Sequence, residues 1–252
     1  MNEETKIFTI TSAKGGTGKS IFAVNLAATY AKMGYHVLLV EIDFYSSNIA
    51  YLLNLHYEND IYNLEQDIVN NKFKDMKNYI TTYKENFDVM VAPKDPRDAH
   101  KLNGSYLNSV VEKLKKSYQI ILFDTNHIID DINLLTFDLT TTLLYLINNT
   151  SVDLKNMKSM VSIFNDMERE NYKIILYEAK EKASGYFSKT EMKNIIGAHI
   201  DYEIVNDFFV KNLESYILNG KVMLYEDSFR KKHSSVVKKF ELLAKSLLKE
   251  KK

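Results

Sequence analysis

Short apolar runs alternate along this chain with longer stretches in which apolar residues recur every three or four positions. Runs of the first kind fit strands buried on both faces, and stretches of the second kind fit helices with one buried face. The runs predicted as strands lie at residues 7–11, 36–42, 78–83, 89–92, 119–124, 142–148, 173–177 and 200–204. The stretches predicted as helices lie at residues 21–28, 49–55, 60–71, 108–117, 153–171, 189–196 and about 234–250. This alternation predicts an α/β fold, a mostly parallel twisted sheet with helices on both faces.

Length and composition narrow the class of protein. The 252 residues contain no low-complexity linker or internal repeat, so we predict a single domain over residues 1–252. There is no cysteine, which excludes disulfides and Cys-ligated iron–sulfur clusters. The formal net charge is zero, so the chain as a whole is not drawn toward nucleic acid or membrane. The polar N-terminus and the shortness of the apolar runs predict a cytoplasmic protein.

A glycine-rich segment lies between the first predicted strand and the first predicted helix. It reads Lys14-Gly15-Gly16-Thr17-Gly18-Lys19-Ser20 and is followed by Ile21. Glycines let a backbone curl so that its N–H groups point at phosphate oxygens, and the following helix adds the positive end of its dipole. In such a loop the last lysine reaches the β- and γ-phosphates and the serine hydroxyl ligates Mg²⁺. We therefore predict that residues 15–21 bind a nucleotide and that Ser20 is a metal ligand.

Acidic residues follow two of the predicted strands. Asp124 ends the strand at 119–124, and Asp43 follows the strand at 36–42. Ligands of parallel α/β sheets gather at the carboxyl ends of the strands. Because Mg²⁺ keeps several waters and needs only one or two protein oxygens, Ser20 and Asp124 suffice as its ligands. The alternative for Asp124 is a helix N-cap.

Lys14, directly before the paired glycines, indicates a family. The segment KGGTGKS resembles the deviant Walker A motif of the MinD/ParA ATPases, which implies ATP as the nucleotide and hydrolysis to ADP and phosphate. In that family the equivalent lysine crosses a two-fold dimer and touches the partner's phosphates, so the resemblance makes Lys14 catalytic together with Lys19. It also implies that Asp43 orients the attacking water and that Asp124 is the Walker B aspartate. Glu41 stands where relatives usually carry another aspartate, and its role stays open. The alternative for Lys14 is a solvated loop lysine.

Three further segments resemble the CpaE/TadZ branch of this family, which positions pilus and secretion machinery. They are residues 89–96, residues 151–156, and Asn206-Asp207 followed by residues 214–221. The chain departs from the family pattern at Thr125-Asn126-His127, where relatives show Thr-Pro-Pro or a nearby glycine. It departs again at Tyr177-Glu178, where many relatives place Asn-Arg. The adenine contacts are therefore left unassigned, and the efficiency of hydrolysis is left open.

The last predicted helix is basic and amphipathic. From Arg230 onward the chain has nine basic residues and two acidic ones, a net charge of +7 that the rest of the chain balances. In MinD-like proteins such a terminal helix binds membrane, whereas in ParA- and CpaE-like proteins the last helix packs on the sheet. An apolar stripe is more commonly core, so we predict packing. The lysines remain candidates for contact with DNA, anionic lipid or an acidic partner.

These features lead to one main functional hypothesis and three alternatives. The main one is a switch that forms a homodimer around ATP, hydrolyses it slowly, and recruits or positions the protein partner of a localised machine of the pilus, secretion or conjugation type. One alternative is a nucleotide-binding scaffold with little or no hydrolysis, and another is a ParA-like partitioning ATPase acting on DNA. A third, a bacterial tyrosine-kinase ATPase domain, is disfavoured because the last tyrosine is Tyr225 and no terminal tyrosine cluster follows. We expect the protein in the cytoplasm, or at the periphery of the membrane or the nucleoid.

Overall fold

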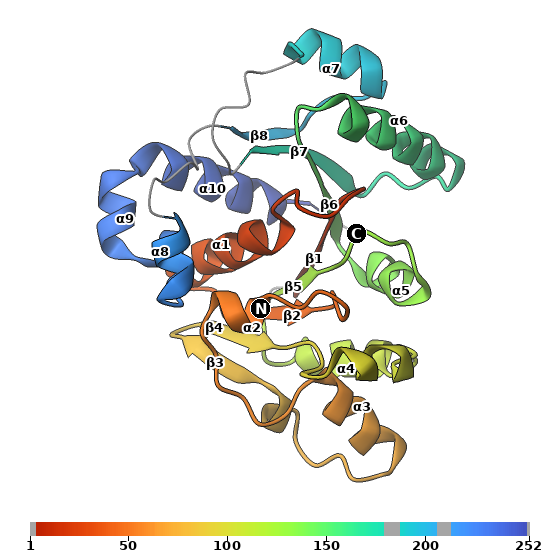
Figure 1. Ribbon diagram of the computed structural model, residues 1–252, viewed down its shortest axis with the longest axis vertical. Coiled ribbons are helices and arrows are strands. Elements are labelled where there is room, and N and C mark those ends of the chain that lie inside the picture. Colours follow the sequence, from red (N-terminus) through yellow and green to blue (C-terminus); the bar gives the residue numbers. More distant parts are fainter. Residues whose placement is uncertain (1–3, 179–186, 206–212, 251–252) are drawn as a thin grey trace.

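One eight-stranded sheet organises the protein (Figure 1). The computed structural model describes residues 4–178, 187–205 and 213–250. In chain order the strands are β1 Lys6–Thr11, β2 Val37–Glu41, β3 Thr81–Lys84, β4 Phe87–Met90, β5 Ile120–Asp124, β6 Thr142–Ile147, β7 Tyr172–Glu178 and β8 Tyr202–Val205. The spatial order is β3-β4-β2-β5-β1-β6-β7-β8. Neighbouring strands are parallel except for β3 and β4, which confirms the predicted mostly parallel sheet.

Helices cover both faces of this sheet (Figure 1). The α-helices are α1 Lys19–Lys32, α2 Ile49–Leu52, α3 Ile61–Val69, α4 Leu107–Leu114, α5 Asp131–Leu139, α6 Ser151–Asp166, α7 Lys189–Ile196, α8 Leu213–Leu218, α9 Asp227–Lys232 and α10 Ser234–Leu247. The described residues also form the 3₁₀ helices η1 Met76–Tyr79, η2 Pro96–Lys101 and η3 Met223–Tyr225.

Successive strand residues face opposite layers, which explains why the strands are apolar throughout. On β2, Leu39 packs in the core with α1 and α10, whereas Leu38 packs in the core with α3 and α4. On β6, Leu144 belongs to the α1 side and Leu143 to a third cluster with α6 and α7.

The strand order decides which loops lie next to one another at the edge of the sheet. β1 lies between β5 and β6, and β2 lies on the other side of β5, so the carboxyl ends of β2, β5 and β1 are adjacent. The register pairs Asp124 with Ile10 of β1 and with Glu41 of β2. The loop after β1, the end of β5 and the loop after β2 therefore meet at one edge of the sheet.

Some local predictions were wrong. The run at 78–83, predicted as a strand, is split between η1 and β3, because the Asp75 side chain accepts the Lys77 N–H and caps a helical turn. The helix predicted to reach residue 171 ends at Asp166, since Glu168 adopts a left-handed turn with φ 52°. Helices α5, α8 and α9 were not predicted. The segment Asn206-Asp207 lies outside the described residues.

The last helix packs on the body of the protein. The apolar stripe of α10 is buried against α1 and β8, and Phe240, fully buried, lies 5.5 Å from Phe22 of α1 between ring centroids. The packing prediction is confirmed, and the stripe is covered by protein. Within residues 4–178, 187–205 and 213–250, no helix is both long and apolar enough to span a bilayer.

Candidate functional site: a phosphate-binding loop at the sheet edge

The glycine-rich loop joins β1 to α1. Gly16 and Gly18 have φ of 76° and 92°, a left-handed conformation that only glycine adopts without strain. A Cβ on Gly18 would also lie 2.8 Å from Cε1 of Tyr177, so a side chain there would collide with a buried ring. Gly18 is the N-cap of α1, and no side chain from the described part of the chain caps that helix. The first N–H groups of this 14-residue helix are thus available to a phosphate.

Ser12 makes hydrogen bonds to several groups of the glycine-rich loop. Its Oγ accepts hydrogen bonds from Lys19 Nζ at 3.1 Å and Thr17 Oγ1 at 2.9 Å, and it donates to the Lys14 carbonyl at 2.8 Å. Lys19 is nearly buried, and burial lowers the pKa of its ammonium, while Asp124 and Asp43 raise it. The loop is therefore folded with its Lys19 amine already facing the acidic end of the sheet.

Asp124 is a fully buried carboxylate at the end of β5. Among the described residues, neither of its oxygens makes a hydrogen bond of ordinary geometry, although the Ser20 hydroxyl is close enough to lower its pKa. Burial raises the pKa of Asp124 to about 7, and Glu41 adds to the rise. An unsatisfied buried carboxylate beside a serine hydroxyl offers the oxygen ligands that Mg²⁺ prefers. Ser20 and Asp124 thus fit a magnesium ion.

The acid that ends β2, Glu41, and the acid that follows this strand, Asp43, have different surroundings. Glu41 is buried, and its carboxylate accepts backbone hydrogen bonds from Asn48 at 2.6 Å, Ile49 at 2.9 Å and Ala92 at 3.1 Å. Asp43 is partly exposed, and its Oδ1 accepts the Ser46 N–H at 3.1 Å. Asp43 therefore keeps acceptor capacity toward the site, whereas Glu41 is committed to the backbone.

Lys14 is held by another part of the structure. Its Nζ lies 2.9 Å from Oδ2 of Asp153, in the first turn of α6, and its side chain is 36% exposed while that of Asp153 is 2% exposed. The same Oδ2 also accepts from the Asn148 N–H and the Thr150 hydroxyl, each at 3.2 Å. The two lysines of the loop thus have separate partners, Ser12 for Lys19 and Asp153 for Lys14.

Side-chain amides of asparagine residues hold the segment after Asp124 through hydrogen bonds. Asn126 Oδ1 accepts the Ile128 N–H at 2.7 Å and Nδ2 of Asn133, on α5, at 2.8 Å. His127 is exposed, and its ring would lie 4.0 Å from a Cβ on Gly15. This departure from the family pattern therefore forms a turn fastened to α5 and lying against the glycine loop.

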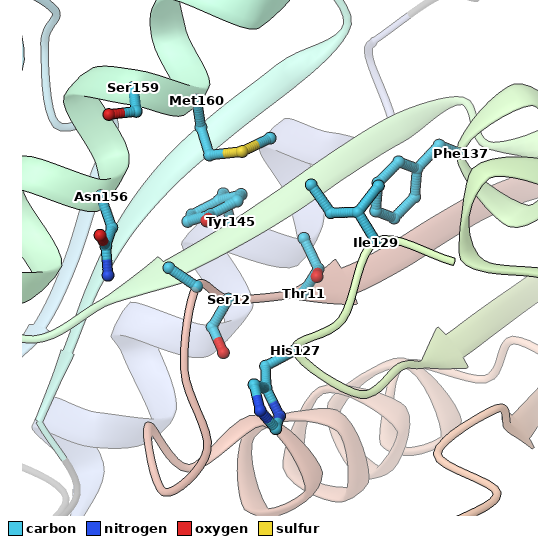
Figure 2. Close-up of a pocket in the computed structure, with 10 residues that line it drawn as sticks. Thr11, Ser12, His127, Ile129, Phe137, Tyr145, Asn156, Ser159 and Met160 are labelled. Atoms are coloured by element: carbon cyan, nitrogen blue, oxygen red, sulfur yellow. The ribbon is translucent and has the colours of Figure 1, made fainter. Parts of the chain in front are cut away.

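A cavity of about 220 Å³ adjoins the loop on the α6 side. Figure 2 shows Tyr145 and Met160 at its centre, Phe137 and Ile129 on one side, and His127 near the loop that leads into α1. Ser12 and Ala13 contribute the wall that it shares with the glycine-rich loop.

The structure brings Lys19, Ser20, Asp43 and Asp124 together and leaves Lys14 at the neighbouring α6. Residues 15–18 form the loop itself, and Ile21 lies in the first turn of α1. Sequence reasoning missed Ser12 and Asp153. An acid in the first turn of a helix that follows a sheet strand was the available signal for Asp153. A hydroxyl side chain just before a glycine loop is too common to have singled out Ser12.

A glycine-rich loop between strand and helix, with a lysine, a serine and a buried strand-end aspartate converging on it, defines a P-loop nucleotide-binding protein. A family model described as the CobQ/CobB/MinD/ParA nucleotide binding domain matches residues 8–210. The chain belongs to this family, whose MinD/ParA members are P-loop ATPases.

Relatives and solved structures agree with this assignment. A putative tyrosine-protein kinase CapB of Staphylococcus aureus is 31% identical over 123 residues, 48% of this chain and 52% of that protein. The septum site-determining protein MinD of Synechocystis is 29% identical over 119 residues, 47% of this chain and 44% of that protein. The chain thus spans about half the length of these curated relatives.

Two solved structures share the fold over nearly the whole chain. A ParA family ATPase from Chlorobium tepidum has a TM-score of 0.79 at 18% identity and covers 95% of this chain and 98% of its own. MinD of Pyrococcus horikoshii, complexed with Mg-ADP, has a TM-score of 0.75 at 22% identity and covers 97% of this chain and 96% of its own.

Proposed function

We propose that this protein is an ATP-driven switch. Two copies close around ATP, slow hydrolysis to ADP and phosphate reopens them, and the closed dimer recruits the protein partner of a localised cellular machine. Residues 15–21 bind the triphosphate, and Ser20 and Asp124 hold Mg²⁺, which supplies charge neutralisation of the phosphates. Asp43 orients the attacking water.

The position of Lys14 is the observation that supports this proposal most. Its amine is partly exposed and paired outside its own phosphate loop, with Asp153 of α6. A lysine that served its own nucleotide would have its Nζ beside the Nζ of Lys19. Instead, Nζ of Lys19 lies on Ser12, inside the loop, and Nζ of Lys14 lies on Asp153, outside it. An exposed cation at the rim of a phosphate site is suited to reach the triphosphate of a second copy, where it stabilises developing charge.

Exposed apolar side chains after β5 and in the first turn of α6 give the second copy a surface to cover. Ile128 and Ile129, after β5, are 53% and 51% exposed, and Val152, next to Asp153, is 57% exposed. Ile129 also lines the 220 Å³ cavity beside the loop. Exposed apolar residues beside a polar site are typical of surfaces that associate. The proposed dimer buries them together with the cavity.

The test of dimerisation uses light scattering after size exclusion. Asp43→Ala, which retains ATP, is expected to run at twice the monomer mass of 29.3 kDa with Mg·ATP and as a monomer with ADP. Adding Lys14→Gln is expected to abolish the dimer, whereas Lys32→Gln, which removes another partly exposed paired lysine, leaves it intact. A folded Asp43→Ala protein that stays monomeric in every nucleotide state rejects the sandwich.

A non-hydrolysing scaffold is the competing function. The turn of Asn126, fastened to Asn133 of α5, favours it, because a segment held in this way resists the movement that hydrolysis requires of the loop after Asp124. Phosphate release is measured alone and with added partner, vesicles or DNA, against Lys19→Ala. Turnover above that variant rejects the scaffold.

We propose that the protein attaches to its target through a basic surface of its own. On α10, Lys238, Leu242 and Lys245 are exposed at intervals of four and three residues, and Glu241 is engaged by Arg230 at 2.7 Å. We propose that this basic ridge attaches the dimer to an anionic membrane surface, because Leu242, 67% exposed, adds an apolar group that a lipid headgroup region can bury.

The ridge is tested by flotation with anionic vesicles and by binding to duplex DNA. The double variant Lys238→Glu, Lys245→Glu weakens both interactions, whereas Leu242→Ser, which removes the apolar group and leaves the charge unchanged, weakens only the lipid interaction. DNA binding alone assigns the protein to the ParA-like partitioning type.

Two sequence segments support a proposal for the branch of the family and for the cellular machine that the protein serves. We assign the chain to the CpaE/TadZ-like branch on residues 89–96 and 151–156, and hence to a machine of the pilus, secretion or conjugation type in the cytoplasm or at its membrane boundary. A MinC:MinD complex from Aquifex aeolicus, TM-score 0.76 at 20% identity, is a structural neighbour in which such a fold holds a protein partner.

A tyrosine-kinase function is kept as an alternative because of the name of the CapB relative. Incubation with ATP followed by mass spectrometry decides it. Phosphotyrosine that is absent from Lys19→Ala favours the kinase, and ADP formation without phosphotyrosine favours the switch.

A further inference from the structure

We infer that Glu41 is a positioning residue for the reaction: its carboxylate fastens the Asn48 end of the loop at residues 42–48 and so holds Asp43 at the phosphate site. The inference rests on the proposed ATP hydrolysis, and it gives a role to the one acid at this edge whose identity departs from the family pattern.

One carboxylate joins three backbone segments. Oε1 accepts the N–H groups of Asn48 and Ile49, where α2 begins, and Oε2 accepts the N–H of Ala92, just after β4. Charge-assisted hydrogen bonds of this kind are stronger than neutral ones, and here they lie in a buried setting where solvent does not compete. The extra methylene of glutamate, compared with aspartate, lets the carboxylate extend from β2 to α2.

The loop that results is fixed at both of its ends. At the start, the Ile42 N–H donates to the Asp124 carbonyl at 2.7 Å and the Phe44 side chain is buried. At the far end, Glu41 holds the N–H groups of Asn48 and Ile49, and Ile49 is itself fully buried. The residues between these anchors thus form a loop that is held at both ends.

The other end of α2 is also confined. A Cβ on Gly220 would lie 2.8 Å from the Leu53 carbonyl oxygen and 2.5 Å from Cβ of Asn54. Tyr83 fixes this turn, since its hydroxyl donates to the Gly220 carbonyl at 2.8 Å and accepts the Val222 N–H at 3.1 Å. With its N-terminal end on Glu41 and its C-terminal end against Gly220, α2 is a rigid boundary of the loop.

Asp43 lies near the start of this loop, between Ile42 and Phe44. Its Oδ1 accepts the Ser46 N–H, a turn within the fixed loop. Phosphoryl transfer depends chiefly on positioning, and displacement of a reacting group by about 1 Å can cost up to about 10²-fold in rate. Release of the far anchor therefore frees the turn at Ser46 that holds the Asp43 carboxylate, without altering the phosphate-binding loop.

The test is Glu41→Gln compared with Glu65→Gln. Glu65 is an equally buried acid on α3, and its Oε1 accepts the Asn103 N–H, which lies outside the loop, at 3.3 Å. A glutamine at position 41 keeps the shape but presents an NH₂ group to at least one backbone N–H. We expect kcat to fall about tenfold in Glu41→Gln while the affinity for ATP changes less than about twofold. Glu65→Gln is expected to retain kcat.

Hydrogen exchange provides a readout that does not need turnover. In the nucleotide-bound state, Glu41→Gln is expected to speed exchange at the amides of Asn48, Ile49 and Ala92, and Glu65→Gln is not. Should Glu41→Gln fail to fold, Glu41→Asp is measured in the same way, with a smaller expected loss.

The outcomes separate this inference from the proposed function. Unchanged kcat in Glu41→Gln, or an equal loss in Glu65→Gln, overturns it. If the wild-type protein shows no turnover, the proposed hydrolysis fails while exchange still decides: faster exchange confined to the three amides supports positioning by Glu41, and unchanged exchange overturns it.

Discussion

Replacing Asp124 with asparagine isolates the energetic consequence of a buried, unsatisfied carboxylate. The side chain is fully buried beside Ser20, Glu41, Lys19 and Asp43, and its pKa is raised from 3.8 to about 7. A folded-state pKa above the unfolded value means that the folded protein binds the proton more tightly. The stability that protonation confers is complete below the unfolded pKa and is lost as the pH rises to the folded pKa.

The magnitude follows from the size of this shift. The pKa of Asp124 is shifted by about three units, and each unit corresponds to about 1.36 kcal/mol. At high pH the nucleotide-free protein therefore lacks about 4 kcal/mol of the folding stability that it has when Asp124 is protonated. Between pH 5 and pH 8 the wild type is expected to lose about 3 kcal/mol through Asp124. Asparagine has no charge to bury, so Asp124→Asn lacks this loss. The stability difference between variant and wild type therefore changes by about 3 kcal/mol over that interval, in favour of the variant at pH 8.

Denaturant unfolding of both proteins at pH 5 and pH 8, without nucleotide, measures this change. Titrating groups that do not interact with Asp124 are present in both proteins and cancel in the comparison. Added Mg·ATP is expected to stabilise the wild type more than the variant, because only the wild type supplies the carboxylate ligand. A stability difference that is the same at both pH values refutes the reasoning that Asp124 is an unsatisfied buried acid.

Three further predictions concern the loop and the last helix. Asp153→Asn releases Lys14 and is expected to tighten ATP-dependent dimerisation about fivefold, measured by ultracentrifugation against ATP; an unchanged dissociation constant contradicts a restraining role. Gly18→Ala is expected to weaken binding of fluorescent ATP by about tenfold or more, because the φ is left-handed and Tyr177 blocks the Cβ; tight binding contradicts it. Phe240→Glu is expected to lower stability by about 4 kcal/mol or more, whereas Leu242→Glu, on the exposed side, leaves thermal unfolding unchanged.

The fold was predictable because its signals are repeated along the chain. Each central strand is apolar on both faces, as β2 and β5 show, and such strands exist only in a sheet covered on both sides. Helix α5 was missed because its start depends on a single contact, the Asp130 side chain accepting the Asn133 N–H, which the apolar pattern does not contain. The antiparallel pairing of β3 likewise depends on a turn in which Asn86 has φ 61°.

The site was predictable only where residue type and chain position are enough. Lys19, Ser20 and Asp124 follow from a loop and a strand end, and the strand order brings them together. The partners of Lys14 and Glu41 could not be read from the sequence, because they depend on distances between α6, α2 and β4 that only packing determines. Both of these contacts join segments separated along the chain, and both restrain a residue near the phosphate site.

The structure of Asp43→Ala bound to Mg·ATP tests the central claim most directly. The account predicts a two-fold dimer in which Lys14 has left Asp153 and its Nζ lies within hydrogen-bonding distance of a phosphate on the partner's ATP. A bound triphosphate with Lys14 still paired to Asp153, or with its amine facing solvent and no second copy nearby, contradicts it.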